Sequence, residues 1–158
     1  MISVIGLDPG ISQQHPGGYA DITDGEVVLR AFDTFSLLDM RERMNYLFAY
    51  ADRVDSWVEL VTRPGKLRHH AGLLEGVAVG IGIKCQRVTP VKWQGALSLR
   101  KPKSYSTPQH KNRLRAAAQQ LYPHLADRIT LATADALLIA EYGWQLLQAE
   151  QRLIGSTV

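Results

Sequence analysis

Residues 1–31, MISVIGLDPGISQQHPGGYADITDGEVVLRA, predict the opening of an antiparallel sheet. The first apolar run contains β-branched side chains, which is typical of a buried strand, and the Asp-Pro-Gly sequence that follows ends it. Asp24-Gly25 is a tight hairpin signal between two further runs. The predicted strands are residues 3–7, 19–23 and 26–31, which together form a three-stranded meander.

The rest of the chain alternates between predicted helices and strands. The predicted helices are residues 37–54, 70–84, 90–97, 107–122 and 130–152, and the predicted strands are residues 55–61 and 86–89. Polar and basic loops are predicted at residues 62–69 and 98–106, with Thr107 as an N-cap before Pro108. No repeat or linker interrupts this order, so residues 1–158 are predicted to be one domain.

The composition narrows the class of protein. An apolar fraction of 46% and a charged fraction of 21% are ordinary for a folded globular chain. The single cysteine, Cys85, excludes an intramolecular disulfide and a cysteine zinc cluster, and it fits a reducing compartment. No secretory leader is recognisable, and no run approaches the roughly 18 apolar residues of a membrane span. We therefore expect a cytoplasmic protein without a membrane partner.

Basic residues are concentrated in the middle of the chain. Residues 76–126 contain no Asp or Glu, yet they hold nine of the 18 Lys and Arg residues. A field of one sign attracts a polyanion, so this tract favours a nucleic-acid partner over an ordinary solvated surface. There is no Walker A motif, and no nucleotide cofactor is expected.

Three glycines lie four residues apart in the predicted helix 70–84. Gly72, Gly76 and Gly80 share one helix face, although each glycine costs about 1 kcal/mol relative to alanine. Such spacing indicates a very close approach by another element. The approaching element is either the sheet of the same chain or a second copy of the chain at a dimer seam.

Three acids in distant segments are candidates for metal-dependent chemistry. Asp8 follows the first strand, Glu59 lies among apolar residues of the fourth, and Asp135 lies early in the apolar last helix. Hydrolysis of a phosphodiester with two divalent ions needs several carboxylates that face one cleft. Each acid also has a simpler interpretation: a turn residue, an exposed strand residue and a helix N-terminal anion, respectively.

The sequence resembles the RuvC family of Holliday junction resolvases, including phage-type relatives. The resemblance is carried by IGLDPGIS, VELV, LLEGVAVGIGIKCQRVTPVKWQGAL and TADALLIAEYG, and it extends over nearly the whole chain. It implies an α/β fold of the RNase H-like type, with a mixed five-stranded sheet flanked by helices. It also implies a bacterial or phage-encoded homodimer that cuts branched DNA, with two Mg²⁺ or Mn²⁺ ions in each active site.

The family's acids can be matched to this chain at three of four positions. The resemblance assigns Asp8, Glu59 and Asp135 as metal ligands and catalytic residues, whereas the expected fourth acid is replaced by Ala132. Three explanations stay open. An acid was deliberately changed to alanine, which we favour; or Thr130, Thr133 or Asp127 substitutes for it; or the protein binds junctions without cutting them.

The remaining expectations concern DNA contact. The loop after the fourth strand is expected to carry a residue that wedges into the junction, with Leu67 or His69 as the candidates. The residues expected to bind DNA are Lys66, Arg68, His69, Arg100, Lys101, Lys103, Lys111 and Arg115. An actin-like phosphotransferase shares the aspartate after the first strand, but it predicts a much longer chain.

Overall fold

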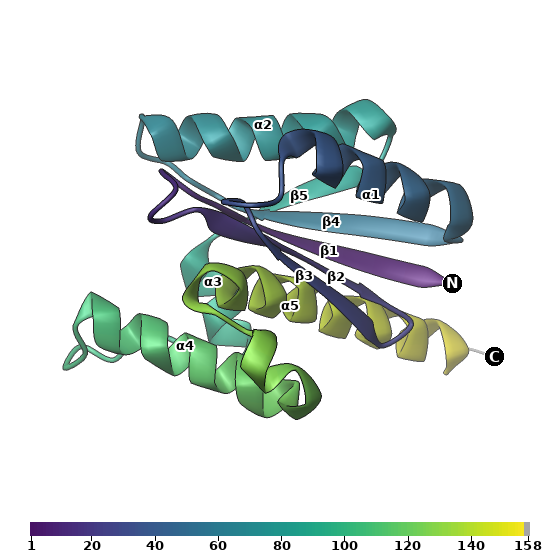
Figure 1. The fold of residues 1–158 in the computed structure, drawn as a ribbon. Coiled ribbons are helices and arrows are strands. Elements are labelled where there is room, and N and C mark those ends of the chain that lie inside the picture. Colours follow the sequence, from purple (N-terminus) through teal and green to yellow (C-terminus); the bar gives the residue numbers. More distant parts are fainter. Residues whose placement is uncertain (157–158) are drawn as a thin grey trace.

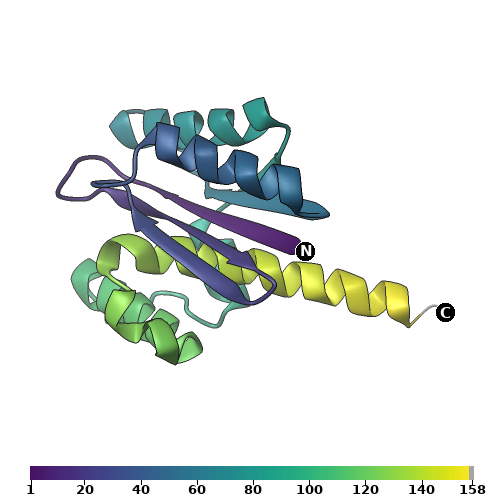
Figure 2. The same cartoon turned by 45° about the vertical axis from the view of Figure 1, so that its right-hand side comes forward.

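The computed structural model describes residues 1–156 and contains one mixed sheet between two layers of helices (Figures 1 and 2). The strands are β1 (Ile2–Pro9), β2 (Gly17–Thr23), β3 (Glu26–Ala31), β4 (Arg53–Glu59) and β5 (Lys84–Val88). The helices are α1 (Leu37–Tyr50), α2 (Lys66–Ile81), α3 (Pro90–Ala96), α4 (Thr107–Leu121), the 3₁₀ turn η1 (Pro123–Arg128) and α5 (Leu131–Gly155).

The five strands are arranged in the order β3-β2-β1-β4-β5. The first three strands are antiparallel neighbours, as the Asp24-Gly25 turn predicts, while β4 joins β1 in parallel and β5 joins β4 in parallel. Helices α1 and α2 cover one face of the sheet, and α5 crosses the other, with α3 and α4 on that side (Figure 1). The predicted mixed five-stranded fold is confirmed.

Strand alternation divides the core into two parts. Ile5 and Leu7 of β1 pack with α1 and α2, whereas Val4 packs with α5 on the opposite face. Asp8 falls on the same side of the strand as Val4. The alternation therefore directs this acid toward α5 rather than toward the α1–α2 layer.

Several predicted boundaries are wrong by a few residues. Helix α2 begins at Lys66, four residues before the predicted start. Its N-cap residue is Gly65, which has no side chain to cap the helix and so gives no start signal in the sequence. The helix ends at Ile81, where Gly82 adopts a left-handed conformation at φ 100°. The cap of α4 is Ser106 rather than Thr107, and its hydroxyl accepts a hydrogen bond from the Gln109 amide.

A buried ion pair connects α1 to the sheet. The Asp21 carboxylate of β2 is fully buried, and it accepts hydrogen bonds of 2.9 and 2.8 Å from the Arg43 guanidinium. The Tyr19 hydroxyl donates a further hydrogen bond of 2.9 Å to the same carboxylate. Since a buried charge is tolerated only when it is paired, Arg43 holds α1 against this side of the sheet.

Candidate active site

Asp8 and Glu59 lie at the carboxyl ends of neighbouring parallel strands. Leu7 of β1 is paired with Val58 of β4, so the next residue on each strand is one of the two acids. The sequence placed Glu59 inside its strand, but it is the last residue of β4. This edge of the sheet is where side chains of adjacent parallel strands converge, and it brings the two carboxylates into one region.

Asp135 reaches the same region from the first turns of α5. The approach is close because β1 and β2 have glycine where they meet this helix. A Cβ atom on Gly6 would lie 2.1 Å from the Ala136 carbonyl oxygen, and one on Gly18 would lie 2.3 Å from that of Ala132. No other residue type fits at these two contacts, so the glycines allow the helix to bring Asp135 beside the strand ends.

The three carboxylates interact through a poorly hydrated environment. Asp8 and Asp135 are 9% and 3% exposed, and Asp135 is surrounded by apolar residues of α5. Burial raises the pKa of Asp8 well above its ordinary value, and the charges of Asp135 and Glu59 raise it further. Burial also raises the pKa of Glu59, against a hydrogen bond from Trp93 that lowers it.

Lys111 of α4 extends into this group of acids. Its ammonium forms an ion pair with the Asp135 carboxylate, although the side chain as a whole is 46% exposed. Burial lowers the pKa of Lys111, but the charges of Asp135, Asp8 and Glu59 outweigh that effect and raise it. The lysine is therefore charged, and its partners are the three predicted catalytic acids.

Helix α3 supports the pocket from one side. The indole Nε1 of Trp93, a fully buried residue, donates a 3.0 Å hydrogen bond to Glu59 and fixes the direction of this carboxylate. Beside it, the buried His110 ring contacts the side-chain oxygen of Gln94 at 3.0 Å. Burial and the charge of Arg113 lower the pKa of His110, which favours the neutral ring.

The donor chemistry of the pocket fits a hard divalent cation. Carboxylate oxygens are the ligands that Mg²⁺ and Mn²⁺ prefer, and the buried Oδ1 atom of Asp135 has no hydrogen-bond partner. Over residues 1–156, however, no three or more His, Cys, Asp or Glu side chains are arranged to enclose an ion.

Ala132 lies one helical turn before Asp135, next to the strand residue that pairs with Asp8. Its carbonyl faces Gly18, the partner of Asp8 across the β1–β2 ladder. Two of the proposed substitutes are engaged elsewhere, because the Thr133 hydroxyl accepts a 3.0 Å hydrogen bond from the Thr130 amide and contacts the Thr130 hydroxyl. Asp127 is exposed on η1.

The predicted DNA-binding residues fall into two groups. The first group lies around the start of α4: Arg100, Lys101, Lys103, Lys111 and Arg115. The second lies on the first turn of α2: Lys66, Leu67, Arg68 and His69. The prediction placed the second group on a loop, and this is wrong. The wedge candidate Leu67 is half-buried on the helix, whereas His69 is exposed.

A groove connects Glu59 to the α2 group. Its volume is about 290 Å³, and its lining includes Glu59, Arg68, Gly72 and Arg87. Arg87 is paired with Glu75 at 3.0 Å, whereas Arg68, the other cation of this groove, forms no ion pair within residues 1–156. The groove therefore places the Arg68 side chain and the Glu59 carboxylate on the lining of one hollow.

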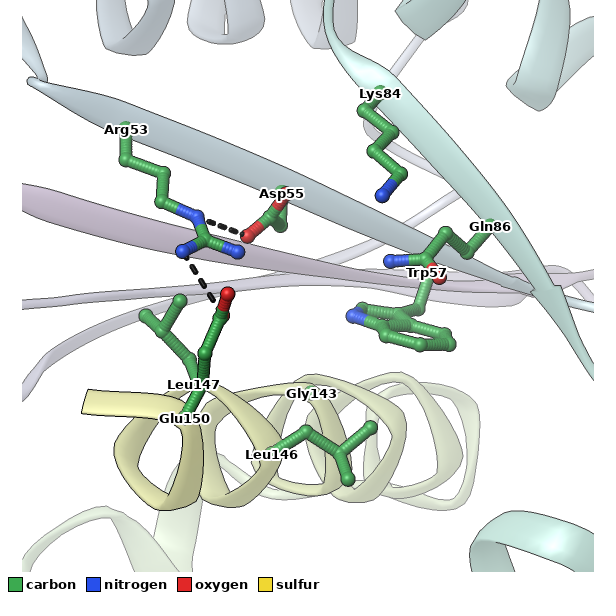
Figure 3. A pocket seen from close by; sticks show the side chains of 9 residues that line it. All are labelled: Arg53, Asp55, Trp57, Lys84, Gln86, Gly143, Leu146, Leu147 and Glu150. Atoms are coloured by element: carbon green, nitrogen blue, oxygen red, sulfur yellow. Dashed lines mark hydrogen bonds and ion pairs between the residues drawn. The ribbon is translucent and has the colours of Figure 1, made fainter. Parts of the chain in front are cut away.

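A second hollow lies at the opposite end of β4 and contains none of the predicted site residues. Arg53 bridges Asp55 at 2.7 Å and Glu150 at 3.0 Å, with Lys84 and Trp57 nearby (Figure 3). These charges are largely paired with one another. The hollow is separate from Asp8, Glu59 and Asp135, so substitutions of its residues can serve as controls for substitutions of those acids.

The sequence did not identify the closest partners of the acids. No linear pattern marks Trp93 as a partner of Glu59, because the contact depends on how α3 packs against α5 in the folded chain. Lys111 was predicted to contact DNA, but not to pair with Asp135. The sequence shows only that Lys111 lies on the basic face of a helix. That position indicates an anionic partner, but it does not say which anion.

The comparisons with known proteins bear on the fold. Thermus thermophilus RuvC matches with a TM-score of 0.50 and 18% identity, over 89% of this chain and 92% of that one. The same protein in complex with a Holliday junction substrate matches with a TM-score of 0.47 and 18% identity, over 90% of this chain and 92% of that one. A fowlpox virus resolvase bound to Holliday junction DNA matches with a TM-score of 0.47 and 10% identity, over 87% of this chain and 94% of the resolvase.

The match to Thermus thermophilus RuvC at a TM-score of 0.50 shows that the chain has the fold of RuvC, in agreement with the resemblance of the sequence motifs. No family model and no curated protein sequence matches the chain. In the described part of the chain, none of the helices has the length and apolar character to cross a membrane.

Proposed function

We propose that this chain, which has the fold of RuvC, is a structure-selective endodeoxyribonuclease that acts on Holliday junctions or other branched DNA. One arrangement carries the proposal: Asp8 and Glu59 lie at the ends of neighbouring parallel strands, and Asp135 of α5 lies close enough to interact electrostatically with both. Lys111, near the start of α4, pairs with Asp135. An acidic pocket next to a cationic surface suits metal-dependent cleavage of a polyanion.

The proposed mechanism assigns a role to each group. Asp8, Glu59 and Asp135 would hold Mg²⁺ or Mn²⁺, which lowers the pKa of bound water and neutralises charge at the scissile phosphate. The resemblance implies two ions for a site with four acids. Trp93 keeps Glu59 directed into the pocket. The basic groups on α4 and α2 would bind phosphates, which positions the DNA without specifying its sequence.

Ala132 supplies the sharpest test of this proposal. Replacing Ala132 by aspartate restores the fourth acid one turn before Asp135, and we expect it to raise the cleavage rate by at least tenfold, about 1.4 kcal/mol. The measurement is nicking of an end-labelled four-way junction in Mg²⁺ or Mn²⁺. The control is Ala132→Asn, which has a similar size but lacks the charge. Failure of the aspartate variant to cut any branched DNA would contradict the enzyme proposal.

The second candidate is a junction-binding protein of nuclease ancestry that does not cut. Ala132 is the observation that favours it, because a three-acid pocket lacks one ligand of the family's set. This candidate predicts tight binding to a four-way junction in gel-shift experiments and no nicking, with or without the Ala132→Asp substitution.

We further propose that α2 forms the seam of a homodimer. Gly72, Gly76 and Gly80 are exposed, and a Cβ atom on any of them would meet nothing within 4 Å. The glycine face therefore does not pack against the sheet of its own chain, which excludes the first of the two explanations of this spacing. Exposed Leu73 and Val79 flank the same face.

Replacing all three glycines by alanine separates the stability of the chain from its association. We expect each alanine to stabilise the helix by up to about 1 kcal/mol, because the side chain enters open space. We expect dimerisation to weaken by at least tenfold, since the backbones can no longer approach closely. Thermal unfolding and analytical ultracentrifugation measure the two effects. Unchanged association would show that the seam lies elsewhere.

A further inference from the structure

A basic loop between α3 and α4 carries an exposed tyrosine. Residues 97–106 form no helix or strand, and the side chains of Lys101, Lys103 and Tyr105 are exposed. The loop lies at the end of the molecule where β1 ends and α2 begins (Figure 1). It is therefore directed toward the same edge of the sheet as the predicted catalytic acids.

Contacts to both neighbouring helices hold the first half of this loop in place. The Leu99 amide donates a 2.6 Å hydrogen bond to the Gln94 carbonyl oxygen of α3, and the Leu99 side chain packs against the core. The Arg113 guanidinium of α4 donates a 2.9 Å hydrogen bond to the Arg100 carbonyl oxygen. The loop is therefore formed before any ligand binds, which reduces the ordering cost of binding.

The ring of Tyr105 is left open by these contacts. Its side chain is 39% exposed, and it forms no hydrogen bond and no ring contact within residues 1–156. The Tyr105 amide donates a 3.1 Å hydrogen bond to the Pro102 carbonyl oxygen, and the next residue, Ser106, caps α4. The backbone on both sides of the ring is thus fixed, while the ring offers its face to a ligand.

The charged groups beside this ring are all cations. The loop contains no Asp or Glu, and Lys101 and Lys103 form no ion pair within residues 1–156. Lys111, which pairs with Asp135, lies about 6 Å along the axis of α4 from the start of that helix. A DNA strand whose phosphates contact the two loop lysines therefore passes near the acids.

The combination of an open ring with free cations favours an unpaired nucleotide over an ordinary duplex. Cations alone suffice to bind the phosphates of a duplex, in which the faces of the bases are stacked on one another. A tyrosine ring can stack only on a base that has left this stack.

We infer that the α3–α4 loop is a binding site for an unpaired nucleotide of branched DNA. The base stacks on the ring of Tyr105, and the neighbouring phosphates pair with Lys101 and Lys103. This inference rests on the proposed function, which it deepens by naming the part of the DNA that this loop binds.

The test is fluorescence anisotropy with a labelled oligothymidylate and with a blunt duplex of equal length. Both titrations are made in EDTA, so that binding is measured without cleavage. We expect Tyr105→Leu to weaken binding of the oligothymidylate by about tenfold, because base stacking is lost, and to leave duplex binding unchanged. Tyr105→Phe keeps the ring, and it should bind both DNAs like the unaltered chain.

Two further variants separate stacking from charge and from tyrosine content. Lys101→Gln/Lys103→Gln should weaken binding of both DNAs and reduce its dependence on salt, because phosphate contacts are lost. The matched control is Tyr50→Leu, which removes a 68% exposed tyrosine of α1, on the other face of the sheet. This control should bind both DNAs with unaltered affinity.

Two results would overturn the inference. One is unaltered binding of the oligothymidylate by Tyr105→Leu; the other is an equal loss of oligothymidylate and duplex binding in a Tyr105→Leu chain that is folded by circular dichroism. Either result leaves the proposed function standing if the chain cuts a junction. Loss of oligothymidylate binding alone, in a chain that cuts no branched DNA, supports the inference and refutes the proposed cleavage.

Discussion

Replacing Asp8 by asparagine is expected to lower the rate of junction cleavage by about a thousandfold while DNA binding persists. Asp8 interacts electrostatically with both Glu59 and Asp135, so its loss removes one of the three proposed metal ligands. Metal ions contribute several kcal/mol to such reactions, and about 4 kcal/mol corresponds to a thousandfold. Single-turnover cleavage of a labelled junction, alongside a gel shift, measures both properties.

The same substitution is expected to stabilise metal-free protein. The folded-state pKa of Asp8 is raised by burial, so folding favours the protonated carboxyl and the charged form costs stability. The unaltered chain therefore loses stability as the pH rises from about 4 through the raised pKa, and Asp8→Asn does not. Thermal unfolding in EDTA at pH 5 and pH 8 should show the larger gain at pH 8.

Asp55→Asn is the matched control for Asp8→Asn. Asp55 is a buried aspartate near the start of β4, but it is paired with Arg53 and lies away from the predicted site. We expect this variant to cleave junctions at the unaltered rate and to be less stable. Equal loss of cleavage in both variants would show that Asp8 acts through the fold rather than through the chemistry.

Replacing Arg43 by methionine is expected to reduce the free energy of unfolding by about 3 kcal/mol. The change leaves the Asp21 carboxylate, which is fully buried, without the cation that compensates its charge. Removing one partner of a buried pair costs about 3–5 kcal/mol, and the lower end applies because Arg43 is 29% exposed. Equilibrium unfolding in urea measures the loss.

Two further variants identify the cause of that loss. Arg43→Met/Asp21→Asn removes the uncompensated charge and should recover most of the stability, since the Tyr19 hydroxyl can still bond to the amide. Arg87→Met breaks the exposed pair with Glu75, in which the arginine is 61% exposed, and should cost less than about 1 kcal/mol. A similar cost for both arginines would contradict the account of the buried pair.

The sequence predicted the order of elements because its signals are local. The Asp24-Gly25 hairpin, the period of α5 and the apolar run of β1 each depend on residues that are neighbours in the chain. The start of α2 was missed for the same reason: Gly65 offers no capping side chain, and Leu67 is the one apolar residue among residues 66–69. The rest of this first turn is exposed, so hydrophobic burial leaves no periodic pattern there.

The candidate site was predicted as a set of acids, but its internal contacts were not. Asp8 and Asp135 stand out in the sequence because each is an acid beside apolar residues. A charged group in apolar surroundings is costly unless it has a partner, so such an acid indicates a function. Lys111 gave no such signal, because a lysine on a basic helix has many potential partners. Only the packing of α4 against α5 selects Asp135, and only the glycine contacts of β1 and β2 bring that carboxylate close to the strand ends.

The glycines of α2 illustrate a different limit. Their spacing establishes that one helix face lacks side chains, and it does not distinguish a sheet from a second chain as the neighbour. The structure shows that face to be open, because the sheet is contacted by the opposite side of the helix through Ala71, Leu74 and Ala78.

The most direct test of the central claim compares a labelled four-way junction with a linear duplex of the same sequence. Both are incubated in Mn²⁺ with the Ala132→Asp chain, and the nicks are mapped on all strands. We expect paired nicks on opposing strands of the junction and an intact duplex. Equal cutting of both DNAs, or an uncut junction to which the protein is fully bound, would contradict it.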